Sequence, residues 1–398
     1  MEDVLEASSR GDFTVVTTFA GGGGSSTGYR LAGGKILLAN EFVEEAAITY
    51  SENYPDTPVE VVDIRYITRR KYVTEWFNSF GIRKGDYDLL DGSPPCSTFS
   101  VAGSMHKDKK DAKDVVYSDT TQSRIGYLIH DFVYVALTTQ PKVVVLENVP
   151  QILPKSGQDD GIFSFAVERL RRHGYLCTYK VLTATDYGVG QIRKRLFLVG
   201  IRPDIAKKVG IESEEQLFDE IYPKSFGEVK TLRDVLDGVD INEHERQMLL
   251  SSTRRSTRYE LIRAIPKNPP KVTRLGDVKG GWTSDFSVER WSWNVPARTV
   301  TQMGVQLSRP NYFHPDEDRP FTINELKRIM GLPDDFVLTG SYDQKAERLG
   351  RMVPPLMTSA LATQINERVF KQLKTKPKRL LSTTNEVGRR RSHLTTPV

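Results

Sequence analysis

A cysteine in a short loop is the first residue of this sequence that could carry out covalent chemistry. Residues 91–96 read Asp-Gly-Ser-Pro-Pro-Cys and follow a predicted strand. A thiol reacts as its thiolate, and an unperturbed thiol with a pKa of about 8.5 is mostly protonated at neutral pH. Cys96 is therefore either an inert structural residue or a nucleophile with charge-stabilising groups beside it.

Groups of that kind end or begin two later predicted strands. Glu147 and Asn148 end one apolar strand, and Gln191, Arg193 and Arg195 alternate at the start of another. Side chains alternate along extended backbone, so the last three share one face. A strand-end acid or a solvated basic stretch is ordinary by itself. Together with the cysteine they predict a site for an anion or a polar heterocycle.

A glycine-rich turn follows the first predicted strand. Phe19 and Ala20 lead into four glycines at residues 21–24, and Glu41 and Asp63 end the second and third strands. Glycine lets a backbone turn sharply and approach a ligand, and an acid about 20 residues later can hold ribose hydroxyls. A flexible linker is the alternative. No Gly-Lys-Ser or Gly-Lys-Thr completes a phosphate loop, so the pattern favours a nucleotide-like ligand other than a P-loop substrate.

The elements that must position these residues alternate between strand and helix patterns. Strands are predicted at residues 13–20, 36–41, 59–64, 87–91, 142–148, 176–183 and 195–201, and helices at 43–54, 124–140, 163–173, 322–330 and 356–371. Such alternation predicts an α/β fold with a Rossmann-like, doubly wound, mostly parallel sheet. Strand-end residues then meet at the carboxyl edge, where ligands of such sheets bind.

Length and composition indicate more than one globular domain. The 398 residues are 38% hydrophobic and 27% charged, with no apolar run long enough for a membrane span. We expect a catalytic domain at residues 1–202 and 295–370, a smaller domain at 203–294, and a disordered basic tail at 371–398. The N-terminus lacks a secretory signal, so we expect a cytoplasmic protein with reduced cysteines.

Basic residues are concentrated in two segments. Residues 251–281 carry a net charge of +6 and residues 371–398 carry +7, so the rest of the chain carries −8. This separation is expected of a polyanion-binding protein, although a basic stretch can also be only a solvated face. The candidate contacts to nucleic acid are Arg254, Arg255, Arg258, Lys271 and Arg274.

The motifs together resemble the DNA cytosine-C5 methyltransferase family, in the family's order from Phe19 to Ala362. The matching segments are Phe-Ala-Gly-x-Gly-Gly at 19–24, Asn-Glu at 40–41, Asp-Ile at 63–64, Pro-Pro-Cys at 94–96, Glu-Asn-Val at 147–149, Gln-x-Arg-x-Arg at 191–195 and Gly-x-x-Val-Pro-Pro at 350–355. Ser97 and Arg351 depart from the residues usual in the family.

The resemblance implies a class I methyltransferase that uses S-adenosyl-L-methionine and no metal. Cys96 would be the nucleophile, Glu147 would contact the N3 and amine of the target cytosine, Arg195 would contact its O2, and Arg193 would hold the catalytic loop. The residues that would contact the cofactor are Phe19, Ala20, Gly21, Gly23, Gly24, Glu41, Phe42, Asp63, Ile64 and Pro95.

The resemblance also implies the partners. Residues 203–294 would recognise double-stranded DNA and the target base would be flipped out, with Trp282, Trp291 and Trp293 as packing residues. We expect a monomer of bacterial, archaeal or phage origin, with no membrane partner. A restriction endonuclease of the same specificity would act at the same site without a stable complex. A tRNA cytosine-C5 methyltransferase, a methyltransferase of exocyclic amines and a catalytically silent DNA-binding protein remain the alternatives.

Overall fold

The large domain is built on one seven-stranded sheet. The computed structural model describes residues 1–95, 128–153, 161–280, 287–302, 304, 306–307 and 309–375. The sheet order is β3-β2-β1-β4-β5-β7-β6, and only β7 runs antiparallel to its neighbours. Its strands are β1 (Phe13–Thr18), β2 (Gly34–Asn40), β3 (Val59–Glu60), β4 (Leu89–Gly92), β5 (Val143–Asn148), β6 (Leu176–Thr183) and β7 (Lys194–Ile201). The predicted doubly wound α/β fold is confirmed.

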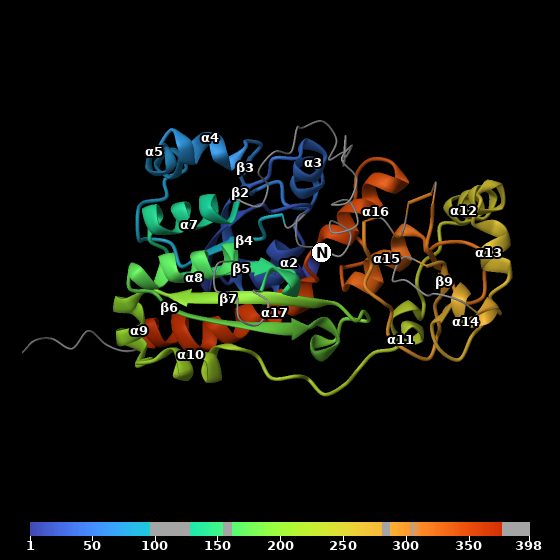
Figure 1. The fold of residues 1–398 in the computed structure, drawn as a ribbon. Helices are drawn as coiled ribbons and strands as arrows, with labels where there is room; N and C mark the ends of the chain where they lie inside the picture. The colour runs from blue at the N-terminus through green and yellow to red at the C-terminus, as the bar shows by residue number, and fades with distance from the viewer. Residues whose placement is uncertain are drawn as a thin grey trace, which may run out of the picture.

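Helices cover both faces of this sheet (Figure 1). One face packs against α1 (Glu2–Ser9), α2 (Gly24–Leu31), α9 (Pro203–Val209), α10 (Glu214–Ile221) and α17 (Pro355–Ile365). The other packs against α4 (Ile64–Arg69), α5 (Val73–Ser79), α7 (Leu128–Thr139) and α8 (Ile162–Arg172), while α3 (Glu44–Asn53) lies beside β3. The central strand β5 is buried along its whole length, which agrees with the apolar run at its residues 143–146.

The third predicted strand is much shorter than its sequence pattern indicates. β3 ends at Glu60, and Asp63 instead caps α4 by accepting the amide of Arg65 at 2.9 Å. The β-branched run at residues 59–64 therefore leads into a helix, because an aspartate side chain can accept a hydrogen bond from a free amide in the first helical turn. The helix predicted at residues 322–330 is confirmed as α15 (Ile323–Met330), with Thr322 and Glu325 forming a capping box at its start.

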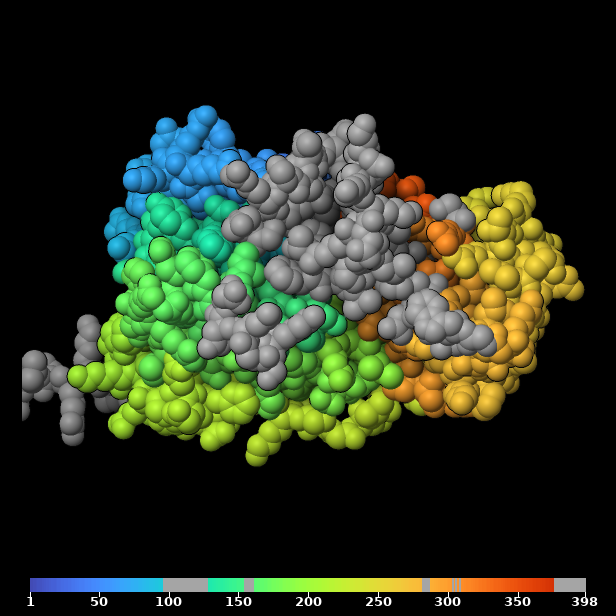
Figure 2. Space-filling view, viewed as in Figure 1, coloured from blue at the N-terminus to red at the C-terminus, as the bar shows by residue number. Residues whose placement is uncertain are grey.

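The smaller domain contains short helices and a three-stranded sheet. The helices are α11 (Leu232–Leu236), α12 (Glu243–Arg255), α13 (Tyr259–Arg263) and α14 (Leu275–Lys279), and the sheet order is β10 (Tyr312–Phe313), β9 (Glu289–Arg290) and β8 (Thr273–Arg274). This domain forms one continuous body with the large one (Figure 2). Helices α15 and α16 (Tyr342–Arg351) share a core with residues of both domains.

Two stretches lie in different surroundings from those predicted. Ile205 of α9 and Leu217 of α10 are buried in the core of the large sheet, so the predicted boundary after residue 202 lies inside that core. The predicted tail begins as helix: α17 continues through a π-helical turn at Asn366–Phe370 into α18 (Lys371–Thr375). Residues 376–398 lie outside the described residues. Across the described ranges, no helix combines the length and apolar character needed to cross a bilayer.

Candidate active site

A buried acid and an arginine meet at the edge of the sheet. Glu147 is 6% exposed at the end of β5, and Nε of Arg195 at the start of β7 lies 2.9 Å from its Oε1. The antiparallel register aligns Glu147 with Phe197, which places Arg195 two residues away on the same face. Burial raises the pKa of Glu147, while the charges of Arg195 and Arg193 oppose that rise. The pair can therefore present a proton donor or acceptor beside a cation.

The loop that leads to the predicted nucleophile is tied to the same strand end. Nδ2 of Asn148 donates to the carbonyl of Pro94 at 3.0 Å, and its Oδ1 accepts the amide of Val149 at 2.9 Å. Pro94 is two residues before Cys96, which lies outside the described residues. The structure thus brings the approach to Cys96 next to Glu147, and the nucleophilic role of the cysteine stays a prediction.

Arg193 and Gln191 point into protein rather than into an open site. Arg193 is fully buried and donates to the carbonyls of Val300 at 2.8 Å and Gly350 at 2.9 Å. Oε1 of Gln191 accepts the amide of Val300 at 2.9 Å. These bonds join the residues just before β7 to the backbone at Val300 and to α16. Arg193 therefore holds backbone, which is compatible with the supporting role that the resemblance implies.

The glycine-rich turn has the conformation that its sequence requires. Phe19, Gly21 and Gly23 have positive φ angles of 55°, 54° and 99°. Among described atoms, a side chain built on Gly21 would meet nothing within 4 Å, so open space lies beside this turn. A close backbone approach by a ligand is possible there because the glycines have no Cβ. The turn ends where α2 begins, at Gly24.

Glu41 supports this turn from the neighbouring strand. Its carboxylate oxygens accept the amides of Gly21 and Val43, each at 2.7 Å, and burial raises its pKa. A carboxylate has about four acceptor positions, and the amides of Gly21, Val43 and Phe42 use at most three of them, so acceptor capacity remains for a hydroxyl group of a ligand. Glu41 can therefore hold the turn and bind a ribose at the same time.

The other predicted cofactor residues lie around the same edge. Asp63 caps α4 and pairs with Arg65, whose Nη2 is 2.6 Å from Oδ2. Ile64 is buried, Phe42 is 43% exposed, and Pro95 ends the described part of the β4 loop. The open glycine turn, the remaining acceptor capacity of Glu41 and an exposed aromatic ring fit an adenine nucleoside with a charged tail.

Arg351, where the family usually has asparagine, lies within this region. Its Nε donates to Oε1 of Gln302 at 2.6 Å, and Nη2 lies 2.5 Å from Oε1 of Glu347. Burial raises the pKa of Glu41, and the charge of Arg351 partly opposes that rise. The departure therefore adds a cation next to the acid that supports the glycine turn.

The predicted DNA-contacting residues are spread over the smaller domain. Arg254, Arg255 and Lys271 are exposed, whereas Arg258 and Arg274 are partly buried. Nε of Arg274 lies 3.7 Å from Oε2 of the buried Glu289, so this arginine also packs within the domain. Basic side chains of α12 thus reach solvent, while Arg274 of the small sheet packs against a buried acid.

The three predicted packing tryptophans differ in their surroundings. Trp291 is fully buried and donates from Nε1 to Glu289 at 2.7 Å. Trp293 is partly buried and donates from Nε1 to Asp316 at 2.9 Å. Trp282 lies outside the described residues. Trp291 therefore belongs to the core of the smaller domain.

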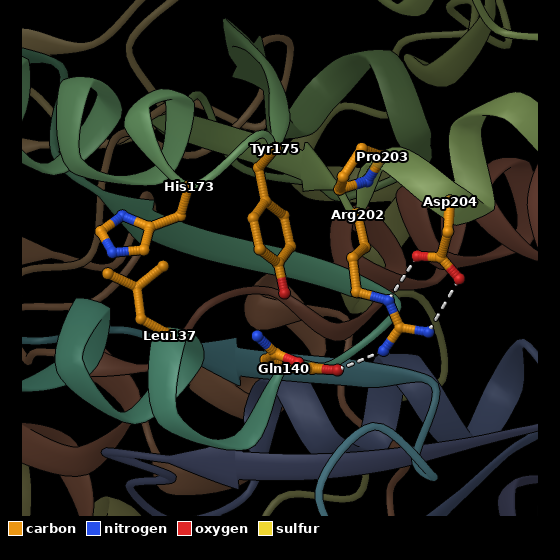
Figure 3. Close-up of a pocket in the computed structure, with 7 residues that line it drawn as sticks. All are labelled: Leu137, Gln140, His173, Tyr175, Arg202, Pro203 and Asp204. Carbon is orange, nitrogen blue, oxygen red and sulfur yellow. Dashed lines mark hydrogen bonds and ion pairs between the residues drawn. The ribbon is translucent and has the colours of Figure 1, made fainter.

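A cavity of about 440 Å³ lies at the opposite edge of the sheet. Arg202 lines it and binds the carbonyl of Gln140 and the carboxylate of Asp204 (Figure 3). Both Gln140 and Arg202 flank the edge where β5 begins and β7 ends. The amino edge of a doubly wound sheet is not where its ligands bind, so this cavity is separate from the candidate active site.

Three buried acids among the described residues escaped prediction: Asp91, Glu289 and Glu325. Asp91 is 2% exposed at the end of β4, and Glu325 forms a buried ion pair with Arg319 at 2.7 Å. The sequence did contain a signal for Asp91. It is an acid at the end of an apolar strand, immediately before the Gly-Ser-Pro-Pro-Cys loop.

Known proteins resemble this chain over most of its length. Residues 13–367 match the family model of the C-5 cytosine-specific DNA methylase. Type II methyltransferase M.Eco47II of Escherichia coli is 29% identical over 89% of this chain and 78% of its own. Putative type II methyltransferase M.MJ0563P of Methanocaldococcus jannaschii is 26% identical over 89% of this chain and 99% of its own.

Solved structures share the fold. A putative DNA modification methyltransferase encoded within an E. coli prophage has a TM-score of 0.63 at 18% identity, over 89% of this chain and 99% of its own. A DNMT2 mutant of Spodoptera frugiperda has a TM-score of 0.60 at 16% identity, over the same shares. Since the family model spans most of the sequence and the predicted fold is present, the chain belongs to the C-5 cytosine-specific DNA methylase family and is a DNA cytosine-C5 methyltransferase.

Proposed function

We propose that this enzyme flips a cytosine out of a specific duplex sequence, attacks its C6 with Cys96 and methylates its C5. The pairing of Glu147 with Arg195, beside the loop held by Asn148, carries the proposal. These buried side chains cannot contact a base that is stacked inside a duplex, so the target base must be flipped out to reach them.

The residue types suit this reaction because C5 of cytosine is a poor nucleophile. Addition of the Cys96 thiolate to C6 makes C5 enamine-like, and nearby arginine favours the thiolate form. Glu147 supports N3 and the exocyclic amine, and Arg195 lies close enough to Glu147 to contact O2 of the same ring. Loss of the C5 proton after methylation lets the thiolate leave.

The cofactor would bind at the glycine turn. S-adenosyl-L-methionine, when bound, supplies the methyl group. Phe19 and the turn glycines would lie against it, Glu41 would accept ribose hydroxyls, and Asp63 with Ile64 would lie at the adenine. Glu41 keeps acceptor capacity because its hydrogen bonds to the turn amide of Gly21 and to the amide of Val43 use only part of it.

The smaller domain would select the DNA sequence. Exposed basic residues on α12 suit phosphate contacts, which give affinity without sequence preference. The names of the relatives support a type II restriction-modification role, with a separate endonuclease that cuts the same unmethylated site. The enzyme would act as a cytoplasmic monomer.

Labelled S-adenosylmethionine with duplex DNA and, in parallel, with tRNA tests the proposal. We expect label in DNA at C5 of cytosine. Label in tRNA alone would overturn the choice of DNA, and no label in either, with DNA binding intact, would indicate a silent DNA-binding protein. Conversion sequencing of methylated plasmid then identifies the recognition sequence.

A further inference from the structure

The chain that follows helix α16 packs against the glycine turn. A side chain built on Gly22 would meet Cε of Met352 at 2.5 Å, and one built on Gly24 would meet the carbonyl oxygen of Val353 at 2.6 Å. The turn glycines thus leave room for this backbone and its side chains. Arg351, the last residue of α16, is therefore held beside the turn.

The guanidinium of Arg351 is fixed by two side chains. Its Nε donates to Oε1 of Gln302 at 2.6 Å, and its Nη2 lies 2.5 Å from Oε1 of Glu347, while 31% of the side chain stays exposed. Its charge partly opposes the rise that burial causes in the pKa of Glu41, whose carboxylate accepts the amide of Gly21 at 2.7 Å. A cation in a defined position therefore lies near Gly21, beside which the described atoms leave open space.

The strand order gives the direction in which the cofactor would lie along the sheet edge. Strands β3, β2, β1 and β4 are neighbours in that order. The proposed adenine contact Asp63 follows β3, the proposed ribose contact Glu41 follows β2, the glycine turn follows β1, and Cys96 follows β4. A cofactor bound along this row has its adenine at the β3 end and its methionine part at the glycine turn. The carboxylate of the methionine part then lies close to the end of α16.

That carboxylate needs a partner with the opposite charge. Glu41 and Glu347 are acids and would repel it, while the amides of the glycine turn carry no net charge. A guanidinium presents its donors in a rigid fork that matches a carboxylate, and hydrogen bonds between charged groups are stronger than those between neutral groups. The asparagine that is usual in the family at position 351 offers only a neutral amide.

We propose that Arg351 binds the carboxylate of S-adenosyl-L-methionine and makes cofactor recognition by this enzyme depend on that negative charge. The inference rests on the proposed function, because it takes the glycine turn as the cofactor site. Gln302 and Glu347 orient the guanidinium for this contact. The enzyme would therefore discriminate against sulfonium ligands that lack a carboxylate.

Calorimetry with two sulfonium ligands tests the proposal without DNA. S-adenosylmethionine carries the carboxylate, and its decarboxylated form has hydrogen in that place and is otherwise identical. We expect Arg351→Asn to weaken binding of S-adenosylmethionine by about 10-fold, the lower end for a hydrogen bond between charged groups, because the arginine is partly exposed. Binding of the decarboxylated form should not weaken, which also shows that the variant is folded. Equal weakening of both ligands, or of neither, would overturn the proposal.

Two further variants separate the contact from general effects of charge. Arg351→Lys keeps a cation without the fork, so it should retain part of the preference for S-adenosylmethionine. Arg328→Asn is the matched control, because Arg328 lies on the neighbouring helix α15, is 23% exposed and pairs with Asp334 at 2.6 Å. Its affinities for both ligands should equal those of the wild type. Loss of the preference in Arg328→Asn would overturn the proposal, since net charge alone would then explain it.

Failure of this inference can be distinguished from failure of the proposed function. A wild-type protein that binds neither ligand, or that methylates neither DNA nor tRNA, counts against the proposed function. A wild-type protein that methylates DNA but binds both ligands with the same affinity overturns only the role of Arg351, because the carboxylate would then contribute nothing to binding.

Discussion

Nε of Arg195 lies 2.9 Å from Oε1 of Glu147, and both side chains are largely withdrawn from solvent. A buried carboxylate that loses its cation becomes costly to ionise, and a developing charge on the substrate loses a stabilising partner. We expect Arg195→Ala to lower the rate of methyl transfer by about 100- to 1,000-fold. Single-turnover kinetics with duplex DNA measure this loss.

Cofactor binding provides the control for Arg195→Ala. The glycine turn is supported by Glu41 rather than by Arg195, so affinity for S-adenosylmethionine, measured by calorimetry, should stay near the wild-type value. Arg195→Lys keeps a charge but lacks the guanidinium fork, and it should recover only part of the rate. Full activity in the alanine variant would contradict a role for this pair.

The hydrogen bond from Asn148 to Pro94 leads to a prediction about the catalytic loop. Asn148→Ala leaves the Pro94 carbonyl without its 3.0 Å partner, at a cost of about 1–3 kcal/mol in the folded state. The loop before Cys96 is then less well positioned, so methylation should slow by about 10- to 100-fold. Asn324→Ala removes an exposed bond of the same 3.0 Å length to the carbonyl of Asp240, away from the strand edge, and should leave the rate unchanged.

The parts of the site that could be predicted are those determined by sheet topology. Glu41 directly follows β2 and Glu147 is the penultimate residue of β5, and parallel strands bring their carboxyl ends to one edge of the sheet. The burial of Arg193 could not be predicted, because its carbonyl partners at Val300 and Gly350 are more than 100 residues away in sequence. Capping by Asp63 was missed since a β-branched run resembles a strand until its tertiary contacts are known.

The covalent role of the predicted nucleophile is tested by Cys96→Ser. A serine hydroxyl is far less nucleophilic than a thiolate at neutral pH, so methylation should be abolished while cofactor binding persists. Trapping the wild type on DNA that contains 5-fluorocytosine should give a covalent complex that the serine variant does not form. Near-normal turnover of Cys96→Ser would refute the role.

His314 makes stability depend on pH. Burial lowers the pKa of His314 to about 4, against about 6.5 in the unfolded chain. Between these values the unfolded state binds more protons, so stability falls as pH drops, by about 2 kcal/mol between pH 7 and pH 5. Urea unfolding of His314→Gln should show a smaller fall over this range. The exposed His173 offers the control, because His173→Gln should keep the wild-type pH dependence.

Truncation after Thr375 tests the basic C-terminal segment. Leu373 packs against the core and Lys374 donates to the carbonyl of Asp12 at 2.6 Å, so α18 must be kept. Residues 376–398 contain six Lys or Arg and one Glu. Each phosphate contact contributes about 0.9 to the slope of log affinity against log salt concentration. We expect the truncated protein to bind non-specific duplex more weakly and with a shallower slope, while single-turnover methylation at saturating DNA is retained.

A full-length variant with glutamine at the six Lys or Arg positions of residues 376–398 is the control for this truncation. Its salt slope should equal that of the truncated protein, because the charge of the segment rather than its length determines the slope. A wild-type slope in either the truncated protein or the glutamine variant would contradict the prediction.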